Sequence, residues 1–388
     1  MTRSDHSNIP YLLLLVAGAK GAVASTLAVA LAAMQSDAAA VLPSLTTGNM
    51  FDRLGPLPST RLAGWDTSDD SLTTSIKMHG VVPDTIWQSH AEFLDRIPIF
   101  QAPGIEMDFR SQVKKLTQDI TTFKSENPDA RPVFINLLPA AAHFDLSECH
   151  SLSQLFAEAD TAKLPDLAYT LAAVLSGVPV VNFTPNMVEI PAVLDEAVKQ
   201  GVPIAGRDGK TGQTYFKVVL ASALKARSLM VDGWYSLNIL GNADGANLMD
   251  PGRAAGKLRN KTNLLDEILD YTVGENYGAP AHKVHIDYYP PRGDAKEAWD
   301  VIDFKGLFGL PMSIRLNLLA RDSILAAPLV LDLARWVVIL QMADRCGPVP
   351  QLGFYFKKAV GDSPPRTFQD QVAGLLKLER DCDEKIKQ

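Results

Sequence analysis

Cysteine is scarce in this sequence, and the spacings that hold metals or build hydrolase active sites are missing. The chain has three cysteines among its 388 residues, and none of them forms a C-x-x-C pair. This odd, scattered set argues against a disulfide framework or a cysteine zinc site, and it predicts a reducing, cytoplasmic location. The seven histidines show no H-E-x-x-H pattern, and no G-x-S-x-G elbow is present. These absences argue against a histidine zinc site and a serine hydrolase, and the need for any metal ion stays unknown.

An excess of basic charge is also lacking. The chain carries 37 Lys and Arg residues against 44 Asp and Glu residues, a net charge of −7. We therefore expect no nucleic-acid partner, although this balance is compatible with a local basic pocket for a small anion. Hydrophobic residues make up 47% of the chain and charged residues 21%, which excludes disordered, collagen-like and coiled-coil proteins. The length predicts two domains, or three.

One long apolar stretch, at residues 12–34, reads like a signal peptide or a membrane anchor. Lys20 lies at its centre between two glycines, where a charge would be costly in lipid. We therefore predict a buried strand at 11–17, a turn, a helix at 22–34, and no membrane partner.

The turn at residues 18–23 reads G-A-K-G-A-V and is the first candidate site. A strand, a glycine turn and a helix start together direct backbone N–H groups and a positive helix end at one place, which suits a pyrophosphate. The spacing is not G-x-G-x-x-G, so a simple tight turn is the alternative. A second strand is expected at 41–45, and the acidic residue expected at its end is missing there.

The rest of the chain predicts an α/β protein. Residues 178–206 read as strand, helix and strand, with Pro191 at the helix start and Gly201 at its end, which indicates a parallel crossover. Further segments are predicted as helices at 108–125 and 324–342, strands at 132–137, 229–240, 283–289 and 312–319, and a polar tail at 361–388 with one short amphipathic helix. We expect a Rossmann-like parallel-sheet domain with an inserted α/β catalytic and oligomerisation domain, divided as 1–214, 215–322 and 323–388.

Three further polar segments could carry chemistry. Residues 208–214 (DGKTGQT) follow a strand, but the upstream glycine of a Walker A loop is replaced by Ala205. Residues 240–248 (LGNADGANL) are too polar for a core and are either a site or a solvent turn. Lys257 and Lys261 are spaced to share a helix face. Together with Lys296, Lys357 and Lys358, they are either solvated or converge on an anion.

These segments, taken in order, resemble the myo-inositol-phosphate synthase family. The blocks behind the resemblance are 208–214, 236–248 (SLNILGNADGANL), 257–267 (KLRNKTNLLDE), 293–296 (GDAK) and 322–333 (DSILAAPLVLDL). Leucine replaces the family's tyrosine at 237, and arginine replaces an acid at 321. The loop at 18–23 has fewer glycines than the corresponding loop of the family's eukaryotic members. These departures are typical of a divergent, bacterial-type branch.

The resemblance implies an NAD-dependent enzyme that cyclises glucose 6-phosphate, acts on a small sugar phosphate and forms a homotetramer. Hydride removal at C5, enolisation, ring closure and re-reduction would take place in one pocket. Another NAD-dependent sugar-phosphate cyclase or dehydrogenase, and a non-catalytic NAD-binding homologue, remain alternatives. The implied catalytic residues are Lys257, Lys261, Asp294, Lys296 and Lys358, the last preferred over Lys357. The implied cofactor-binding residues are Gly18, Ala19, Lys20, Gly21, Ala22, Val23, Thr184, Asp208, Asp244, Asp322 and Ser323. The implied substrate-binding residues are Lys210, Thr211, Gln213, Asn242, Asn247 and Lys357.

Clustered lysines suit this chemistry because each intermediate carries negative charge on oxygen beside a phosphate. Fixed ammonium groups in a closed site stabilise that charge as it develops. Crowded lysines also lower one another's pKa, which allows proton transfer near neutral pH. Asp294 is placed in the sequence to orient Lys296, two residues later.

Overall fold

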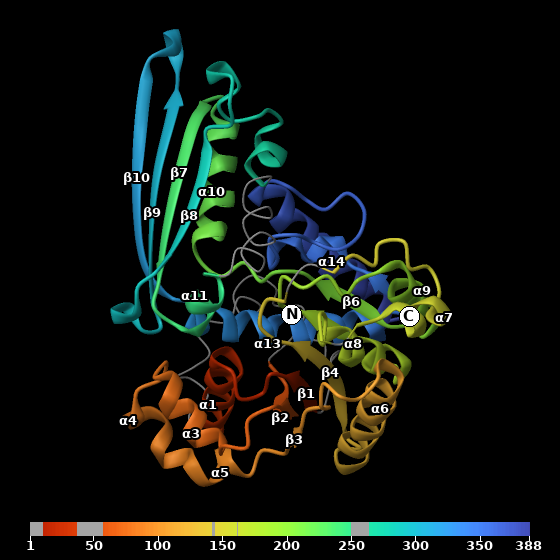
Figure 1. Ribbon diagram of the computed structural model, residues 1–388. Coiled ribbons are helices and arrows are strands. Elements are labelled where there is room, and N and C mark those ends of the chain that lie inside the picture. Colours follow the sequence, from red (N-terminus) through yellow and green to blue (C-terminus); the bar gives the residue numbers. More distant parts are fainter. Residues whose placement is uncertain (1–10, 37–56, 142–143, 161, 250–263) are drawn as a thin grey trace, which may run out of the picture.

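Two β-sheets organise the protein, as the computed structural model shows (Figure 1). The structure describes residues 11–36, 57–141, 144–160, 162–249 and 264–388, with the side chains at 243, 244 and 276 left aside. One sheet has seven strands in the order β11-β6-β5-β4-β1-β2-β3, and the other has four in the order β10-β9-β7-β8. Both the Rossmann-like parallel sheet and the additional sheet expected from the sequence are therefore present.

The seven-stranded sheet is parallel throughout. Its strands are β1 (Tyr11–Ala17), β2 (Ser59–Asp66), β3 (Ile99–Gln101), β4 (Ala130–Asn136), β5 (Val180–Asn182), β6 (Pro203–Gly206) and β11 (Gly347–Pro348). The apolar run of β1 lies at the centre, between β2 and β4, and is buried on both faces. The order from β3 to β6 is that of a dinucleotide-binding sheet, with the strand order reversing beside β1.

Helices cover both faces of this sheet. One face carries α1 (Ala22–Ser36), α3 (Leu72–His79), α4 (Asp84–Trp87), α5 (Ala91–Asp95), α13 (Asp322–Met342) and α14 (Phe368–Ile386). The other face carries α6 (Phe109–Glu126), α7 (Leu152–Glu158), α8 (Asp166–Leu175) and α9 (Pro191–Lys199). Alternate residues of β1 enter the two cores, Leu12 and Leu14 on one side and Leu13 and Leu15 on the other, because successive side chains of a strand point to opposite faces.

The strand that follows α1 differs from the prediction. The segment at 41–45 lies outside the described residues, and β2 comes later, in a stretch for which no strand was predicted. Glycine and proline clusters around this strand obscured its apolar core. β2 pairs with β1 and ends at Asp66, so the acidic residue that seemed to be missing is present, farther along the chain than expected.

The predicted crossover at 178–206 is confirmed. β5, α9 and β6 form it in that order, and β5 pairs with β6 in parallel. Pro191 begins α9, where its missing N–H costs nothing, and Gly201 follows the helix with a φ of +65°. The strand carries the chain straight to residues 207–214, which therefore lie at the carboxyl edge of the sheet.

The second sheet consists of β7 (Met230–Leu240), β8 (His282–Tyr288), β9 (Ala295–Lys305) and β10 (Pro311–Arg321). One of its faces is covered by α10 (Gln213–Ala226) and a short helix at 264–269, and Figure 1 shows α10 lying along it. β9 was not predicted, because Asp300 occupies an inward position at which alternation calls for an apolar residue. The short helix α11 (Ala243–Asn247) follows β7.

Two C-terminal helices return the chain to the first sheet. By length and composition α13 is apolar enough to cross a membrane, but 78% of its apolar window is buried inside the protein, as in a core helix. The short amphipathic helix expected in the polar tail at 361–388 is the 19-residue helix α14, which is longer than predicted and buries Leu375, Leu378 and Cys382 in the core. Charged residues on its outer face concealed the length of this helix. A short turn of 3₁₀-helix at Pro350–Phe354 lies between the two helices.

Candidate functional site

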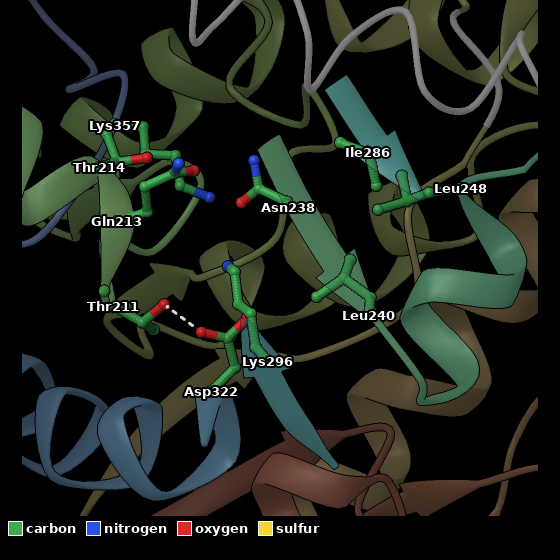
Figure 2. A pocket seen from close by; sticks show the side chains of 11 residues that line it. Thr211, Gln213, Thr214, Asn238, Leu240, Leu248, Ile286, Lys296, Asp322 and Lys357 are labelled. Atoms are coloured by element: carbon green, nitrogen blue, oxygen red, sulfur yellow. Dashed lines mark hydrogen bonds and ion pairs between the residues drawn. The ribbon is translucent and has the colours of Figure 1, made fainter. Parts of the chain in front are cut away.

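A pocket lies where the two sheets meet, beyond the carboxyl end of β6. Its empty volume is about 420 Å³. Figure 2 shows the side chains around it, which come from β7, β8, β9, α13 and the segment that enters α10. The lining residues are Thr211, Gly212, Gln213, Thr214, Asn238, Leu240, Leu248, Ile286, Lys296, Asp322 and Lys357. Ligands of open α/β sheets bind at such carboxyl edges.

Lys296 and Asp322 form an ion pair in this pocket. Lys296 Nζ lies 2.9 Å from Asp322 Oδ2, and Thr211 Oγ1 donates to Asp322 Oδ1 at 3.1 Å (Figure 2). Gly293, at a φ of +55°, turns the chain into β9, so that Lys296 faces inward. Burial by itself raises the pKa of Asp322, but Lys296, Lys357 and the Thr211 hydroxyl together lower it to about 2. The carboxylate is therefore ionised and holds the lysine in place.

Lys357 supplies a second ammonium group to the pocket. Its Nζ lies 2.6 Å from Oδ1 of Asp208, and both side chains are largely buried. Several backbone hydrogen bonds hold the two segments together, among them those from Lys357 N to Asp208 O and from Arg207 N to Lys358 O. Lys358 is exposed and does not line the pocket, so the preference for Lys358 over Lys357 was wrong. Adjacent residues in an extended segment point to opposite sides. Two neighbouring lysines therefore give no sign in the sequence of which one faces the pocket.

Asp294 is not the partner of Lys296. Its carboxylate lies 3.4 Å from Nε of Arg321 and accepts a hydrogen bond from the hydroxyl of Ser323 at 3.3 Å. Burial raises the pKa of Asp294, and Arg321 opposes that shift. Asp294 and Ser323 thus join the turn before β9 to the start of α13, beneath the Lys296–Asp322 pair. Asp322, expected on the cofactor side, is the residue that orients Lys296.

Lys210 lies outside the pocket, contrary to the expectation that it binds substrate. Its buried Nζ donates to Gly353 O at 3.0 Å and to Gln371 Oε1 at 2.8 Å. Burial lowers the pKa of Lys210 to about 7. The side chain therefore ties the 208–214 segment to α14 and to the turn that precedes Lys357. Its position next to Thr211 in a polar motif concealed this inward orientation.

Asn238 lines the pocket, whereas the predicted Asn242 and Asn247 do not. Asn238 and Leu240, on β7, line it. Asn242 Oδ1 accepts from the backbone of Gly245 at the start of α11, and Asn247 Nδ2 donates to Ala140 O at 3.3 Å. Strand alternation was the signal that could have identified Asn238, because it shares a face with Leu240.

The glycine turn between β1 and α1 has the form of a dinucleotide site. Gly18 has a φ of +81°, and a Cβ there would come within 3.2 Å of Leu137 O. Lys20 N donates to Asp66 Oδ2 at 2.8 Å, and Lys20 Nζ donates to Ser68 O. The first N–H groups of α1, at Ala22 and beyond, have no acceptors within the helix. These features fit NAD. The glycine turn lets the backbone come close to a ligand, the N–H groups at the start of α1 can donate to a pyrophosphate, and Asp66 at the end of β2 can accept from a ribose.

Thr184, expected to bind the cofactor, forms a hydrogen bond within the protein through its hydroxyl group. Thr184 Oγ1 donates to Asn182 Oδ1 at 2.9 Å. The amide nitrogens of Asn136 and Asn186 both donate to Asp166 Oδ2 at 2.7 Å. Burial raises the pKa of Asp166. This buried cluster joins the carboxyl ends of β4 and β5 through hydrogen bonds among side chains.

Several predicted positions remain untested by these contacts. Lys257 and Lys261 lie outside the described residues, and the side chain of Asp244 does too. Within the described ranges, no group of three or more His, Cys, Asp or Glu side chains is placed to hold a metal ion.

The sequence of the pocket-forming segment matches a known family. Residues 212–323 match the family model described as Myo-inositol-1-phosphate synthase. Inositol-3-phosphate synthase 1 of Bacteroides thetaiotaomicron is 40% identical over 64% of this chain and 60% of its own length. The inositol-3-phosphate synthase of Spirodela polyrhiza is 30% identical over 81% of this chain and 63% of its own. The chain thus spans about 60% of the length of these curated relatives. The sequence resemblance to this family is confirmed.

Solved structures share the fold along nearly the whole chain. The inositol-3-phosphate synthase of Caenorhabditis elegans superimposes with a TM-score of 0.83 at 20% identity, covering 97% of this chain and 86% of its own. A myo-inositol-1-phosphate synthase-related protein from Thermotoga maritima gives a TM-score of 0.76 at 20% identity, covering 96% and 98%. These superpositions show a common architecture of two sheets.

Proposed function

We propose that this protein catalyses the NAD-dependent cyclisation of glucose 6-phosphate to a myo-inositol phosphate. The observation that carries the proposal is the pocket in which Lys296 and Lys357 meet beside Asp322, at the carboxyl edge of a dinucleotide-binding sheet. The match of residues 212–323 to the inositol-phosphate synthase family covers the strands that build this pocket.

NAD is the cofactor that the first turn suits. The loop at 18–23 and the start of α1 would hold the pyrophosphate, and Asp66 would accept hydrogen bonds from the adenosine ribose. A bound nicotinamide would take up a hydride from the sugar and return it later, so the cofactor is regenerated. A carboxylate at Asp66 disfavours the 2′-phosphate of NADP by like-charge repulsion.

Lys296 and Lys357 would stabilise the negative charge of the substrate and of the enolate oxygen that forms before ring closure. Both are donors only, and each is held by one buried or half-buried carboxylate, Asp322 or Asp208. A held ammonium group needs no reorganisation when charge develops, so it lowers the barrier more than a mobile one. Lys296 can also pass a proton to the enolate oxygen and recover it.

The experiment is incubation of the purified protein with glucose 6-phosphate and a catalytic amount of NAD⁺. Phosphorus and proton NMR identify the product, and NADH absorbance reports net oxidation. A cyclic phosphate without net NADH supports the proposal. Net NADH with an acyclic or lactone product identifies a dehydrogenase instead, and NAD binding without turnover identifies a non-catalytic homologue. Either of these outcomes overturns the cyclase proposal.

We also propose a homotetramer in the reducing cytoplasm. The face of the second sheet opposite α10 exposes Tyr235, Trp299 and Leu319. Exposed aromatic and aliphatic side chains grouped on one sheet face are typical of a subunit contact. Cys149, Cys346 and Cys382 are all free thiols, which agrees with a reducing compartment.

A further inference from the structure

A buried polar cluster lies directly behind the pocket, between α10 and the second sheet. It consists of Lys217, Trp234, Ser236, His282 and Asp300, each less than 10% exposed. None of these side chains lines the pocket. Polar groups are costly to bury unless each is satisfied by a partner, so a cluster of this size calls for an explanation beyond packing.

Asp300 is the acceptor at the centre of the cluster. Trp234 Nε1 and Ser236 Oγ donate to its Oδ1 at 2.7 and 2.5 Å, and Gln213 Nε2 donates to its Oδ2 at 2.9 Å. Three donors therefore converge on one carboxyl group. An ionised carboxylate accepts only, so the Gln213 amide must turn its nitrogen toward Asp300.

Lys217 supplies the compensating charge. It lies on α10 one turn after Gln213, and its Nζ donates to Ser236 Oγ at 3.0 Å and lies 2.7 Å from His282 Nε2. The same nitrogen lies 5.4 Å from the centre of the Trp234 ring. Burial lowers the pKa of Lys217 to about 8, and Asp300 opposes that shift. The Ser236 hydroxyl, which accepts from Lys217 and donates to Asp300, links the lysine to the carboxyl group.

Gln213 connects this cluster to the pocket, because it lines the pocket from the first position of α10 (Figure 2). We propose that Asp300, supported by Ser236 and Lys217, is a positioning residue that fixes Gln213 with its carbonyl oxygen available to a hydroxyl group of the bound sugar phosphate. This inference rests on the proposed function for the identity of the ligand. A carbonyl oxygen accepts hydrogen bonds and so suits a sugar hydroxyl, whereas the ammonium groups of Lys296 and Lys357 donate and suit a phosphate.

Replacing the carboxylate by an amide inverts the polarity of the contact. In Asp300→Asn, the amide oxygen still accepts from Trp234 and Ser236, and the amide nitrogen then faces Gln213. Two facing amide nitrogens repel each other, so Gln213 flips and presents its own nitrogen to the pocket. Gln213→Met removes the contact altogether. Asp303→Asn, on an exposed position of the same strand, is the matched control.

The first test is a double-mutant cycle on the KM for glucose 6-phosphate. We expect Asp300→Asn and Gln213→Met each to raise KM about tenfold, with NAD affinity and the control variant within about twofold of wild type. If Asp300 acts through Gln213, the double variant is no worse than either single variant. Multiplication of the two effects, to about a hundredfold, overturns the proposal.

The second test needs neither a variant nor turnover. Neutron diffraction on deuterium-exchanged crystals of the wild-type protein locates the amide deuterons of Gln213. An N–D bond directed at Asp300 with the carbonyl oxygen facing the pocket supports the proposal, and a carbonyl oxygen facing Asp300 overturns it. A wild type that fails to convert glucose 6-phosphate while showing the expected amide orientation rejects the proposed function and leaves the positioning role of Asp300 standing.

Discussion

Lys357 and Lys358 are neighbours in the chain, yet their ammonium groups have different surroundings. Lys357 is paired with Asp208 in the pocket, and Lys358 is exposed. We expect Lys357→Met to lower kcat at least about a hundredfold, because one fixed charge donor is lost where negative charge develops. Lys358→Met, the matched control, should stay within about twofold of wild type. Steady-state kinetics with glucose 6-phosphate decides, and equal losses in both variants would contradict the assignment of Lys357.

Asp322 makes the stability of the protein depend on acidity. Its pKa in the folded protein, about 2, lies below the ordinary value of 3.8. The ionised carboxylate therefore stabilises the fold above about pH 5, and this contribution is lost as the pH falls toward 2. We expect Asp322→Asn to cost about 2 kcal/mol at neutral pH, with the difference from wild type shrinking near pH 2. Urea unfolding across this range measures it, and a difference that does not vary with pH would reject the ion pair as its source.

At the scale of elements, we expect the end of β2 to set the choice of cofactor. Asp66 accepts from the backbone of Lys20 in the glycine turn and from Ser68. We expect Asp66→Asn to shift the ratio of NAD to NADP affinity about tenfold toward NADP, because the repulsion of a 2′-phosphate is removed. Calorimetric titration with both cofactors measures the ratio. Asp69→Asn, at an exposed neighbouring position, serves as control, and an unchanged ratio would show that Asp66 does not contact the ribose.

At the scale of the whole molecule, the exposed face of the second sheet should join subunits. Trp299 is 47% exposed on this face. If the proposed tetramer forms through this face, Trp299→Lys breaks it into smaller species, because a charge there would be buried without a partner on assembly. Light scattering coupled to size-exclusion chromatography gives the mass. Ile105→Lys, at an exposed apolar residue on a loop before α6, is the control. A variant that keeps a tetrameric mass would place the interface elsewhere.

Local signals identified the elements that repeat one pattern without interruption. The apolar run of β1 with its glycine turn, and the β5–α9–β6 crossover, follow from residues a few positions apart. β9 was not predicted because it carries the buried Asp300, and the length of α14 was underestimated because its outer surface is mostly charged. Their identity depends on which face another part of the chain covers.

The candidate site divides in the same way. Thr211, Gln213, Lys296 and Asp322 were all singled out from sequence, and the fold brings them to one pocket. Pairing was not predictable, since Asp294 is adjacent to Lys296 in sequence but Asp322 holds it in space. Lys210 turned out to be buried against α14 because of contacts with residues more than a hundred positions away.

The amino-acid sequence alone determined the class of fold and the set of charged and amide side chains available to the site, because periodicity and composition are local properties. Tertiary structure alone decided the partner of each lysine, the carboxylate behind Gln213 and the acid at the end of β2. These depend on packing between segments distant along the chain, where burial makes an unpaired charge too costly to tolerate and so selects one arrangement.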